Sequence, residues 1–111
     1  MYVLHVSAPK VAKIGVDMAR GKSCLVAGGV GPWIGCGHPP LSNELSPSEA
    51  REKLSAWHED RIKRLTVGGV TLFAVESMPG STEALAVLDV LEKIPGSRFV
   101  LKSQIRYHCK L

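Results

Sequence analysis

The stretch "CLVAGGVGPWIG", residues 24–35, joins a short apolar run to a cluster of glycines. A run that is apolar on both faces is typical of a strand in a parallel sheet whose two sides are covered. The glycines and Pro32 end the strand and start a loop. We therefore expect a buried strand over residues 24–30 that delivers small residues to its carboxyl end.

A helix is expected on each side of this strand. Before it, Val11, Ile14 and Met18 recur at helical spacing, and Gly21 ends the segment. After it, Ser46, Pro47 and Glu49 form the pattern of a capping box, which predicts a helix start. The expected buried stripe of this second helix is Ala50, Leu54, Trp57, Ile62 and Leu65.

Two more apolar segments, "VTLFAVES" (70–77) and "RFVLKSQ" (98–104), have the composition of strands. Between them "TEALAVLDVLEKI" (82–94) has helical periodicity and ends before Pro95 and Gly96. Helix and strand thus alternate three times, with short joints. This order predicts an α/β fold of about three consecutive β-α units around a parallel sheet.

The chain has 111 residues, enough for one domain with a modest core and too few for two. No apolar run approaches the ~20 residues needed to cross a bilayer. The opening "MYVLHVSAPK" lacks the positive n-region and long apolar h-region of a secretory signal. The sequence therefore predicts a cytoplasmic protein with no membrane partner.

The formal charge of +4 comes mainly from the C-terminal end of the chain. The basic residues that follow Glu92 without an acidic neighbour are Lys93, Arg98, Lys102, Arg106 and Lys110. Isolated bases with only Phe99 and Tyr107 between them are more typical of a solvated surface than of a nucleic-acid interface. We expect no nucleic-acid partner.

The three cysteines, Cys24, Cys36 and Cys109, are odd in number and far apart. This predicts free thiols in a reducing compartment rather than a disulfide framework. Cys36 and His38 lie two residues apart but lack the third and fourth ligands of a zinc site, and no Cys-x-x-Cys is present. We predict no metal-ligating residues.

In a parallel α/β sheet, ligands bind beyond the carboxyl ends of the strands. The residues expected there are 28–33, then Glu76 with Ser77, then 102–104. A carboxylate that ends an apolar strand is costly to bury without a partner. Glu76 therefore either contacts a ligand, as partner of an ammonium group or as a general base, or is structural, paired with a lysine or capping the helix near Ser81.

The glycine cluster does not fit a phosphate cradle, because a P-loop needs Gly-Lys-Ser/Thr at a helix start and this stretch runs into prolines. His58, on a charged helix, is expected at the surface or its boundary. Trp33, in the loop after the first predicted strand, either packs or lines a site. No Ser/His/Asp arrangement of a nucleophile elbow is present, so we predict no catalytic residue.

Several separated motifs resemble the homocysteine S-methyltransferase family in order and spacing. They are Val-Ala-Gly-x-Val-Gly-Pro at 26–32, Trp-His-x-x-Arg at 57–61, and Glu-Ser before a proline-containing turn and Glu-Ala-Leu at 76–85. The resemblance covers about residues 11 to 100. It implies a (β/α)8 barrel that forms methionine by moving a methyl group from S-methylmethionine, S-adenosylmethionine or betaine to homocysteine. In the family, zinc held by three cysteine thiolates binds and activates the homocysteine sulfur.

The resemblance also implies roles for individual residues. Glu76 matches the family glutamate that holds the homocysteine amino group. Gly29, Val30 and Gly31 match the loop that edges the substrate pocket. Trp33 stands where the family often has an aromatic residue.

The chain departs from the family in length and in its cysteines. A complete barrel needs about 250 residues, so we expect one partial domain, an incomplete (β/α)8 barrel over residues 1–111. The zinc-binding cysteines, including a Gly-Gly-Cys-Cys run, have no counterpart, and "MYVLHVSAP" replaces the expected first strand. We expect the chain to be inactive alone and to self-associate through open barrel edges. The alternative is a non-catalytic module that binds a full-length relative or a polyanion.

Overall fold

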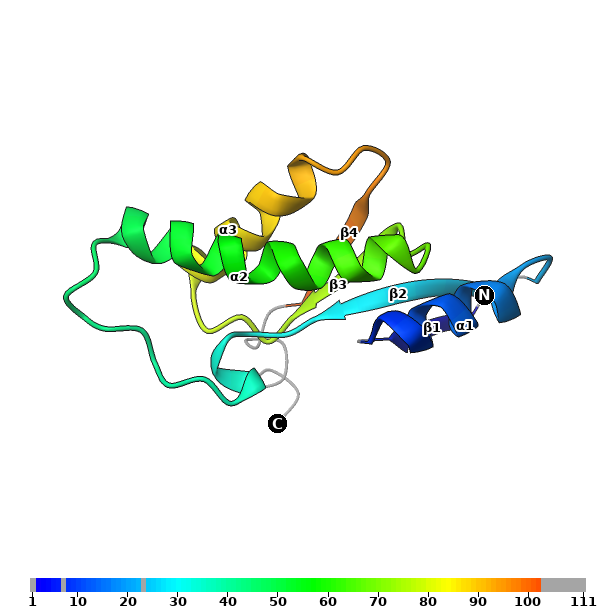
Figure 1. The fold of residues 1–111 in the computed structure, drawn as a ribbon, viewed down its shortest axis with the longest axis horizontal. Helices are drawn as coiled ribbons and strands as arrows, with labels where there is room; N and C mark the ends of the chain where they lie inside the picture. The colour runs from blue at the N-terminus through cyan, green and yellow to red at the C-terminus, as the bar shows by residue number, and fades with distance from the viewer. Residues whose placement is uncertain (1, 7, 23, 103–111) are drawn as a thin grey trace.

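The computed structural model describes residues 2–6, 8–22 and 24–102. Strands and helices alternate along the chain, with one short 3-10 turn in the loop after the second strand (Figure 1). The elements are β1 (Tyr2–Val6), α1 (Pro9–Ala19), β2 (Cys24–Val30), η1 (Ile34–Cys36), α2 (Pro47–Val67), β3 (Leu72–Glu76), α3 (Ser81–Glu92) and β4 (Arg98–Lys102).

The four strands form one parallel sheet in the order β1-β2-β3-β4. The predicted α/β class and the three predicted strands and helices are confirmed. The expectation that the opening segment contributes no strand is wrong, because Tyr2 to Val6 pair in register with Cys24 to Gly28 of β2. A five-residue strand held by pairing with a distant segment leaves only a weak local signal. Of the predicted C-terminal strand, residues 103 and 104 lie outside the described part.

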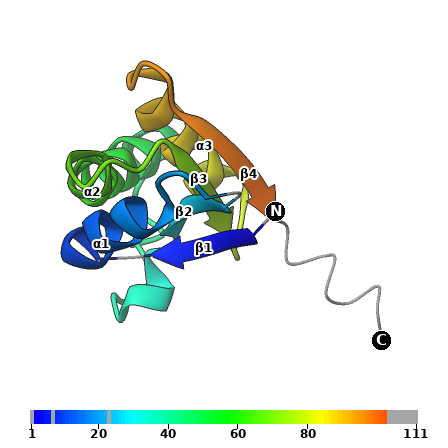
Figure 2. The ribbon, with the colours of Figure 1, turned by 90° about the vertical axis from the view of Figure 1, so that its right-hand side faces the viewer.

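The helices lie on the same side of the sheet (Figure 2). Phe73 and Val75 of β3 are fully buried in one cluster with Ile62 of α2 and Val87 of α3. The expectation that both faces of β2 are covered is therefore not met by the described helices. The other face of the sheet carries Leu72 and Ala74 of β3, and Ala74 lies beside Gly29.

Helix α2 begins as its sequence predicts. Ser46 Oγ accepts the Glu49 backbone N–H at 3.2 Å, and Glu49 Oε2 accepts the Ser46 N–H at 2.8 Å. The buried residues of α2 are Leu54, His58, Ile62 and Leu65. Ala50 and Trp57 are only half-buried, and His58, expected at the surface, is 0% exposed. Spacings of four, four and three residues place His58 in line with the apolar stripe.

Helix α1 is present, but its large apolar residues do not face the sheet. Val11, Ile14 and Met18 are 51%, 59% and 58% exposed. Small residues face the sheet instead: Ala12 is fully buried, and a Cβ on Gly15 would lie 3.5 Å from Val6 Cγ1. Close approach of helix to sheet thus leaves an apolar flank in contact with solvent. No helix in the described ranges has the length and apolarity to cross a bilayer.

Gly28 lies where β2 approaches the helix layer most closely. A Cβ there would lie 2.9 Å from Leu65 Cδ1 and 3.0 Å from Val70 Cγ1. The adjacent Gly29 points to the other face, where the nearest atom would be the Val6 carbonyl oxygen at 3.6 Å. The two neighbouring glycines therefore differ. The absence of a side chain at Gly28 allows the helix layer to pack closely on β2, whereas a Cβ at Gly29 would fit without a collision.

Arg51 of α2 and Asp89 of α3 form a bidentate ion pair. Arg51 Nε donates to Asp89 Oδ2 at 2.6 Å, and Arg51 Nη2 donates to Oδ1 at 2.7 Å. These hydrogen bonds, followed by the charge of Arg51, hold the pKa of the Asp89 carboxyl below its usual range. The pair connects the two helices on the outer side of their contact.

We predict that Gly28→Ala lowers the free energy of unfolding by about 1–3 kcal/mol, as overpacking does in a filled core. Urea denaturation followed by circular dichroism measures the change. Gly29→Ala is the matched control and should change stability much less. Equal losses for the two variants would contradict the packing role of Gly28.

We predict that Asp89→Asn lowers the urea midpoint at pH 7, because it removes the acceptor of Arg51. A carboxyl whose pKa is lowered by folding stabilises the protein above its unfolded pKa of about 3.9, and this stabilisation is lost as the pH falls through the folded value. The difference in urea midpoint between the variant and the parent should therefore become smaller below about pH 4. Asp60→Asn, in the exposed pair with Arg64, should shift the midpoint little at any pH. A difference in urea midpoint between Asp89→Asn and the parent that stays constant from pH 7 to pH 3 would contradict the ion pair between Arg51 and Asp89.

Candidate functional site

A hollow of about 280 Å³ lies at the carboxyl ends of β2 and β3. This is the edge at which parallel α/β sheets hold ligands. Its lining residues are Gly29, Val30, Gly31, Pro32, Arg61, Ala74, Glu76 and Ser77. Four of the five residues expected to contact substrate therefore line one space: Gly29, Val30, Gly31 and Glu76.

Strand register explains why these residues meet. Gly29 is paired with Ala74, and Val30 with Val75. Glu76, the last residue of β3, therefore lies level with Gly31, the first residue after β2. Glu76 is half-buried at this position, and its backbone is in register with Lys102 of β4.

Arg61 of α2 brings a positive charge to the same hollow. Its Nη1 donates to the Gly31 carbonyl oxygen at 3.2 Å, and its guanidinium carbon lies 4.5 Å from the ring centre of Trp57. A guanidinium held over an aromatic face keeps its remaining donors in a fixed direction. Arg61 is the arginine of the Trp-His-x-x-Arg motif, which by itself predicted no role for this side chain.

Ser77 follows Glu76 in a left-handed backbone conformation, with φ of 60°. Such a conformation costs a non-glycine residue free energy and occurs often at binding sites, where the surrounding structure enforces it. The turn places Ser77 on the wall of the hollow directly beside Glu76. Nothing in the sequence marks Ser77 for a positive φ.

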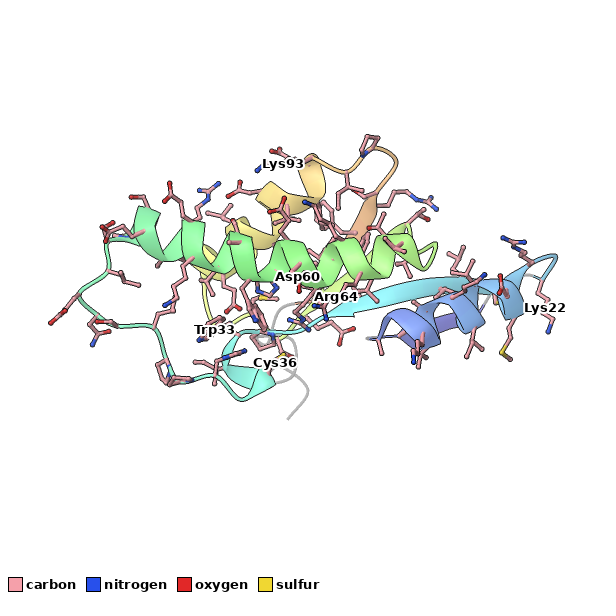
Figure 3. All side chains as sticks on the ribbon, viewed as in Figure 1. Lys22, Trp33, Cys36, Asp60, Arg64 and Lys93 are labelled. Carbon is pink, nitrogen blue, oxygen red and sulfur yellow. The ribbon has the colours of Figure 1, made fainter. Side chains whose placement is uncertain are left out.

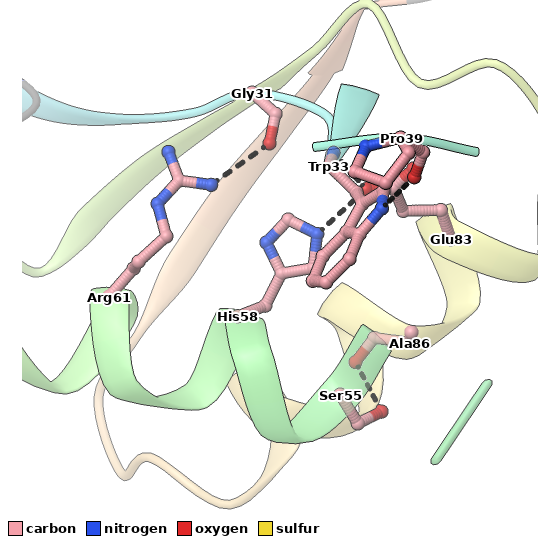
Figure 4. Close-up of polar contacts among 8 residues, drawn as sticks. All are labelled: Gly31, Trp33, Pro39, Ser55, His58, Arg61, Glu83 and Ala86. Carbon is pink, nitrogen blue, oxygen red and sulfur yellow. Dashed lines mark hydrogen bonds and ion pairs between the residues drawn. The ribbon is translucent and has the colours of Figure 1, made fainter. Parts of the chain in front are cut away.

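Trp33 lies outside the residues that line this hollow. Its indole Nε1–H donates to the Pro39 carbonyl oxygen at 2.7 Å, and its ring stacks on His38 at 4.1 Å (Figure 4). It contributes instead to a second, more apolar hollow of about 320 Å³. That hollow is lined by Trp33, Ile34, Pro40, Leu41, Ala50, Leu54, Pro79, Gly80, Thr82 and Glu83.

A buried polar contact fixes the loop that carries Trp33. The Glu83 carboxylate accepts the Trp33 backbone N–H at 2.5 Å and lies 3.0 Å from His58 Nε2 (Figure 4). Because a carboxylate only accepts, Nε2 carries the hydrogen of this contact. His58 is 0% and Glu83 5% exposed, and His58 Nδ1 is a buried nitrogen with no partner among the described residues.

Glu83 is the glutamate of the Glu-Ala-Leu motif, and its burial was not predicted, although its spacing indicates it. Glu83 precedes Ala86, Val87 and Val90 on the buried face of α3 at offsets of three, four and seven residues. An acidic residue in such a stripe needs a buried donor. The donors are the Trp33 amide and His58, so one carboxylate joins α3, α2 and the loop after β2.

The two described cysteines, Cys24 and Cys36, lie far apart in the structure. Cys36 is exposed in the loop after β2, and Cys24 begins that strand at the far end from the hollow. Figure 3 shows this separation, with Trp33 and Cys36 near one end of the sheet and Lys22 near the other. The part of the chain that the structure describes holds no group of three His, Cys, Asp or Glu side chains that could bind a metal ion. Cys109 lies outside this part.

Comparisons with known proteins agree with the motifs. A sequence model described as homocysteine S-methyltransferase matches residues 2–109, which adds the opening segment and most of the C-terminal one to the region of resemblance. Betaine-homocysteine S-methyltransferase of Drosophila melanogaster is 31% identical over 83 residues. This is 72% of the chain but 25% of that protein, so the chain spans a quarter of the length of this curated relative. No solved structure matches the chain.

We predict that Glu83→Ala lowers the free energy of unfolding by about 1–3 kcal/mol, because it leaves the Trp33 amide and His58 without their acceptor. The fluorescence spectrum should shift as well, since the two tryptophans of the chain, Trp33 and Trp57, are 5.1 Å apart beside this contact. Glu59→Ala, in a partly exposed pair with Lys63, is the control. An unchanged spectrum for Glu83→Ala would contradict the role of Glu83 in holding the loop.

Proposed function

This chain belongs to the homocysteine S-methyltransferase family, and we propose that its hollow at the ends of β2 and β3 binds the amino acid part of homocysteine. The observation that supports the proposal most is the meeting of Glu76, Arg61 and the Gly29–Gly31 segment in one space. A carboxylate and a guanidinium that line the same hollow suit a zwitterionic ligand.

In the proposed complex, Glu76 pairs with the ammonium group of homocysteine. Arg61, held by its bond to the Gly31 carbonyl, attracts the carboxylate of the substrate. A Cβ on Gly31 would meet no protein atom within 4 Å, so the glycine leaves open space beside the backbone. Substrate can therefore approach the rim closely, and its thiol points away from the two charged anchors.

The family reaction that we propose for this site moves a methyl group from a donor such as S-methylmethionine to the sulfur of homocysteine, giving methionine. Zinc in such enzymes favours the thiolate form of a bound thiol. The described residues do not fit a zinc site, so the contribution proposed for this chain is to bind and orient homocysteine. We expect no methyl transfer from the 111-residue chain alone. We also propose that the protein is cytoplasmic, because the free thiols of Cys24 and Cys36 suit a reducing compartment.

A second role is favoured by one observation. The edge strand β4 exposes Phe99, Val100 and Leu101 to solvent, each at about half of its surface. Apolar side chains exposed in a row mark interaction surfaces. A non-catalytic interaction module therefore stays the alternative proposal.

We predict that the chain binds L-homocysteine at least about tenfold more tightly than 4-mercaptobutanoate, which lacks the amino group, since a hydrogen bond to a charged group contributes about 1.5–3 kcal/mol. In Glu76→Gln the two ligands should bind alike. Isothermal titration calorimetry measures both affinities, and Glu44→Gln, in an exposed loop position, is the matched control. Retention of the preference in Glu76→Gln would contradict the assignment.

A further inference from the structure

The guanidinium of Arg61 has two contacts that direct it in the hollow. Its Nη1 donates to the Gly31 carbonyl oxygen at 3.2 Å, and its carbon lies 4.5 Å from the ring centre of Trp57. Trp57 and Arg61 are four residues apart on α2, so they lie on the same side of the helix. A planar guanidinium makes a bidentate contact with a carboxylate only when its plane is directed correctly. The two contacts therefore set how Arg61 meets a ligand.

Both contacts depend on the loop that begins after β2. Gly31 and Trp33 are separated only by Pro32, whose ring fixes its φ. The position of the Trp33 amide therefore restricts the position of the Gly31 carbonyl oxygen. The rings of Trp33 and Trp57 meet edge to face, with centres 5.1 Å apart, so Trp33 also limits where the ring of Trp57 can lie.

Glu83 of α3 holds this loop together with His58. Its Oε1 accepts the Trp33 backbone N–H at 2.5 Å and lies 3.0 Å from His58 Nε2 (Figure 4). The imidazole of His58 packs edge to face against Trp57, with ring centres 4.6 Å apart. His58 and Glu83 are 0% and 5% exposed, and neither lines the hollow. The buried pair therefore contacts the backbone of the loop and the ring that Arg61 covers, but not the space for a ligand.

We propose that Trp57 and Glu83 are positioning residues for the recognition of the substrate carboxylate by Arg61. Trp57 supports the guanidinium directly. Glu83 acts from outside the hollow, by fixing the Trp33 amide and, through His58, the ring of Trp57. The inference rests on the proposed function, because it concerns the same hollow. Every residue in this series of contacts lies between the end of β2 and the first turn of α3.

Ligand selectivity of the purified chain tests the role of Trp57. We expect the parent to bind L-homocysteine at least about tenfold more tightly than 3-aminopropanethiol, which lacks the carboxylate. In Trp57→Leu this preference should fall by about three- to tenfold, because the guanidinium loses the ring that supports it. The preference over 4-mercaptobutanoate should stay, because it reports on Glu76, which comes from β3 and not from α2.

Isothermal titration calorimetry measures the three affinities. Trp57→Phe keeps an aromatic face and should keep most of the parent preference for the carboxylate. Phe99→Leu, on β4 and outside the lining of the hollow, is the matched control and should bind as the parent does.

The outcomes separate this inference from the proposed function. A Trp57→Leu variant that keeps the full preference for the carboxylate would overturn the positioning role. Loss of both preferences together would overturn it too, because Trp57 would then support the hollow as a whole. If the parent binds none of the three ligands, the proposed function has failed, and the positioning of Arg61 is then decided on the free chain.

The nuclear magnetic resonance signal of the Arg61 Nε–H measures that positioning without a ligand. The ring current of Trp57 shifts a proton above its face upfield, and the loss of the signal in Arg61→Lys assigns it. In Glu83→Ala the signal should move toward the ordinary arginine position, because the loop and Trp57 lose their support. Glu83→Gln should keep the parent signal, since one carbonyl oxygen can accept both contacts that Oε1 accepts.

Glu83→Asp keeps the charge but is one methylene shorter. It should move the Arg61 signal in the same direction as Glu83→Ala, and it supplies the measurement if Glu83→Ala does not fold. An unchanged signal in either folded variant would refute the positioning role of Glu83.

Discussion

The parallel register between β2 and β3 is the constraint on which the rest of the structure depends. It pairs Gly29 with Ala74 and Val30 with Val75, so both strands end at the same edge of the sheet. A parallel connection needs a crossover, and α2 provides it on the face that carries Phe73 and Val75. Burial of that face leaves the strand ends and the loops beyond them as the place where polar side chains meet. The hollow with Glu76 and Arg61 is a direct result.

The same register divides the glycines of β2 between two tasks. Side chains alternate along a strand, so Gly28 points at Leu65 and Val70, where any side chain would collide. Gly29 and Gly31 lie on or beside the hollow, where a Cβ would meet at most the Val6 carbonyl. One short glycine-rich stretch therefore permits close helix packing at one position and open space for a ligand at the next.

Much of the fold could be predicted from local patterns. The capping box at Ser46 predicts the start of α2, and apolar runs bounded by glycine predict β2 and β3. These patterns could be recognised because each lies within a few consecutive residues. Partners far along the chain could not be predicted. Strand β1 depends on pairing with β2, and the orientation of α1 depends on how closely Ala12 and Gly15 approach the sheet. Topology predicted the place of Glu76 and Ser77, whereas the left-handed backbone of Ser77 and the arrival of Arg61 from α2 at the hollow could not be predicted.

Two glutamates near the β3–α3 connection show why residue type alone does not assign a role. Glu83 is 5% exposed, and its carboxylate accepts the Trp33 amide and the His58 Nε2 hydrogen. These hydrogen bonds of Glu83 hold α2, α3 and the loop after β2 together. Glu76 is half-buried and lines a hollow open to ligands beside a guanidinium. Burial distinguishes the two: a carboxylate enclosed by its own chain stabilises the fold, and one on the wall of a hollow can still exchange partners with a substrate.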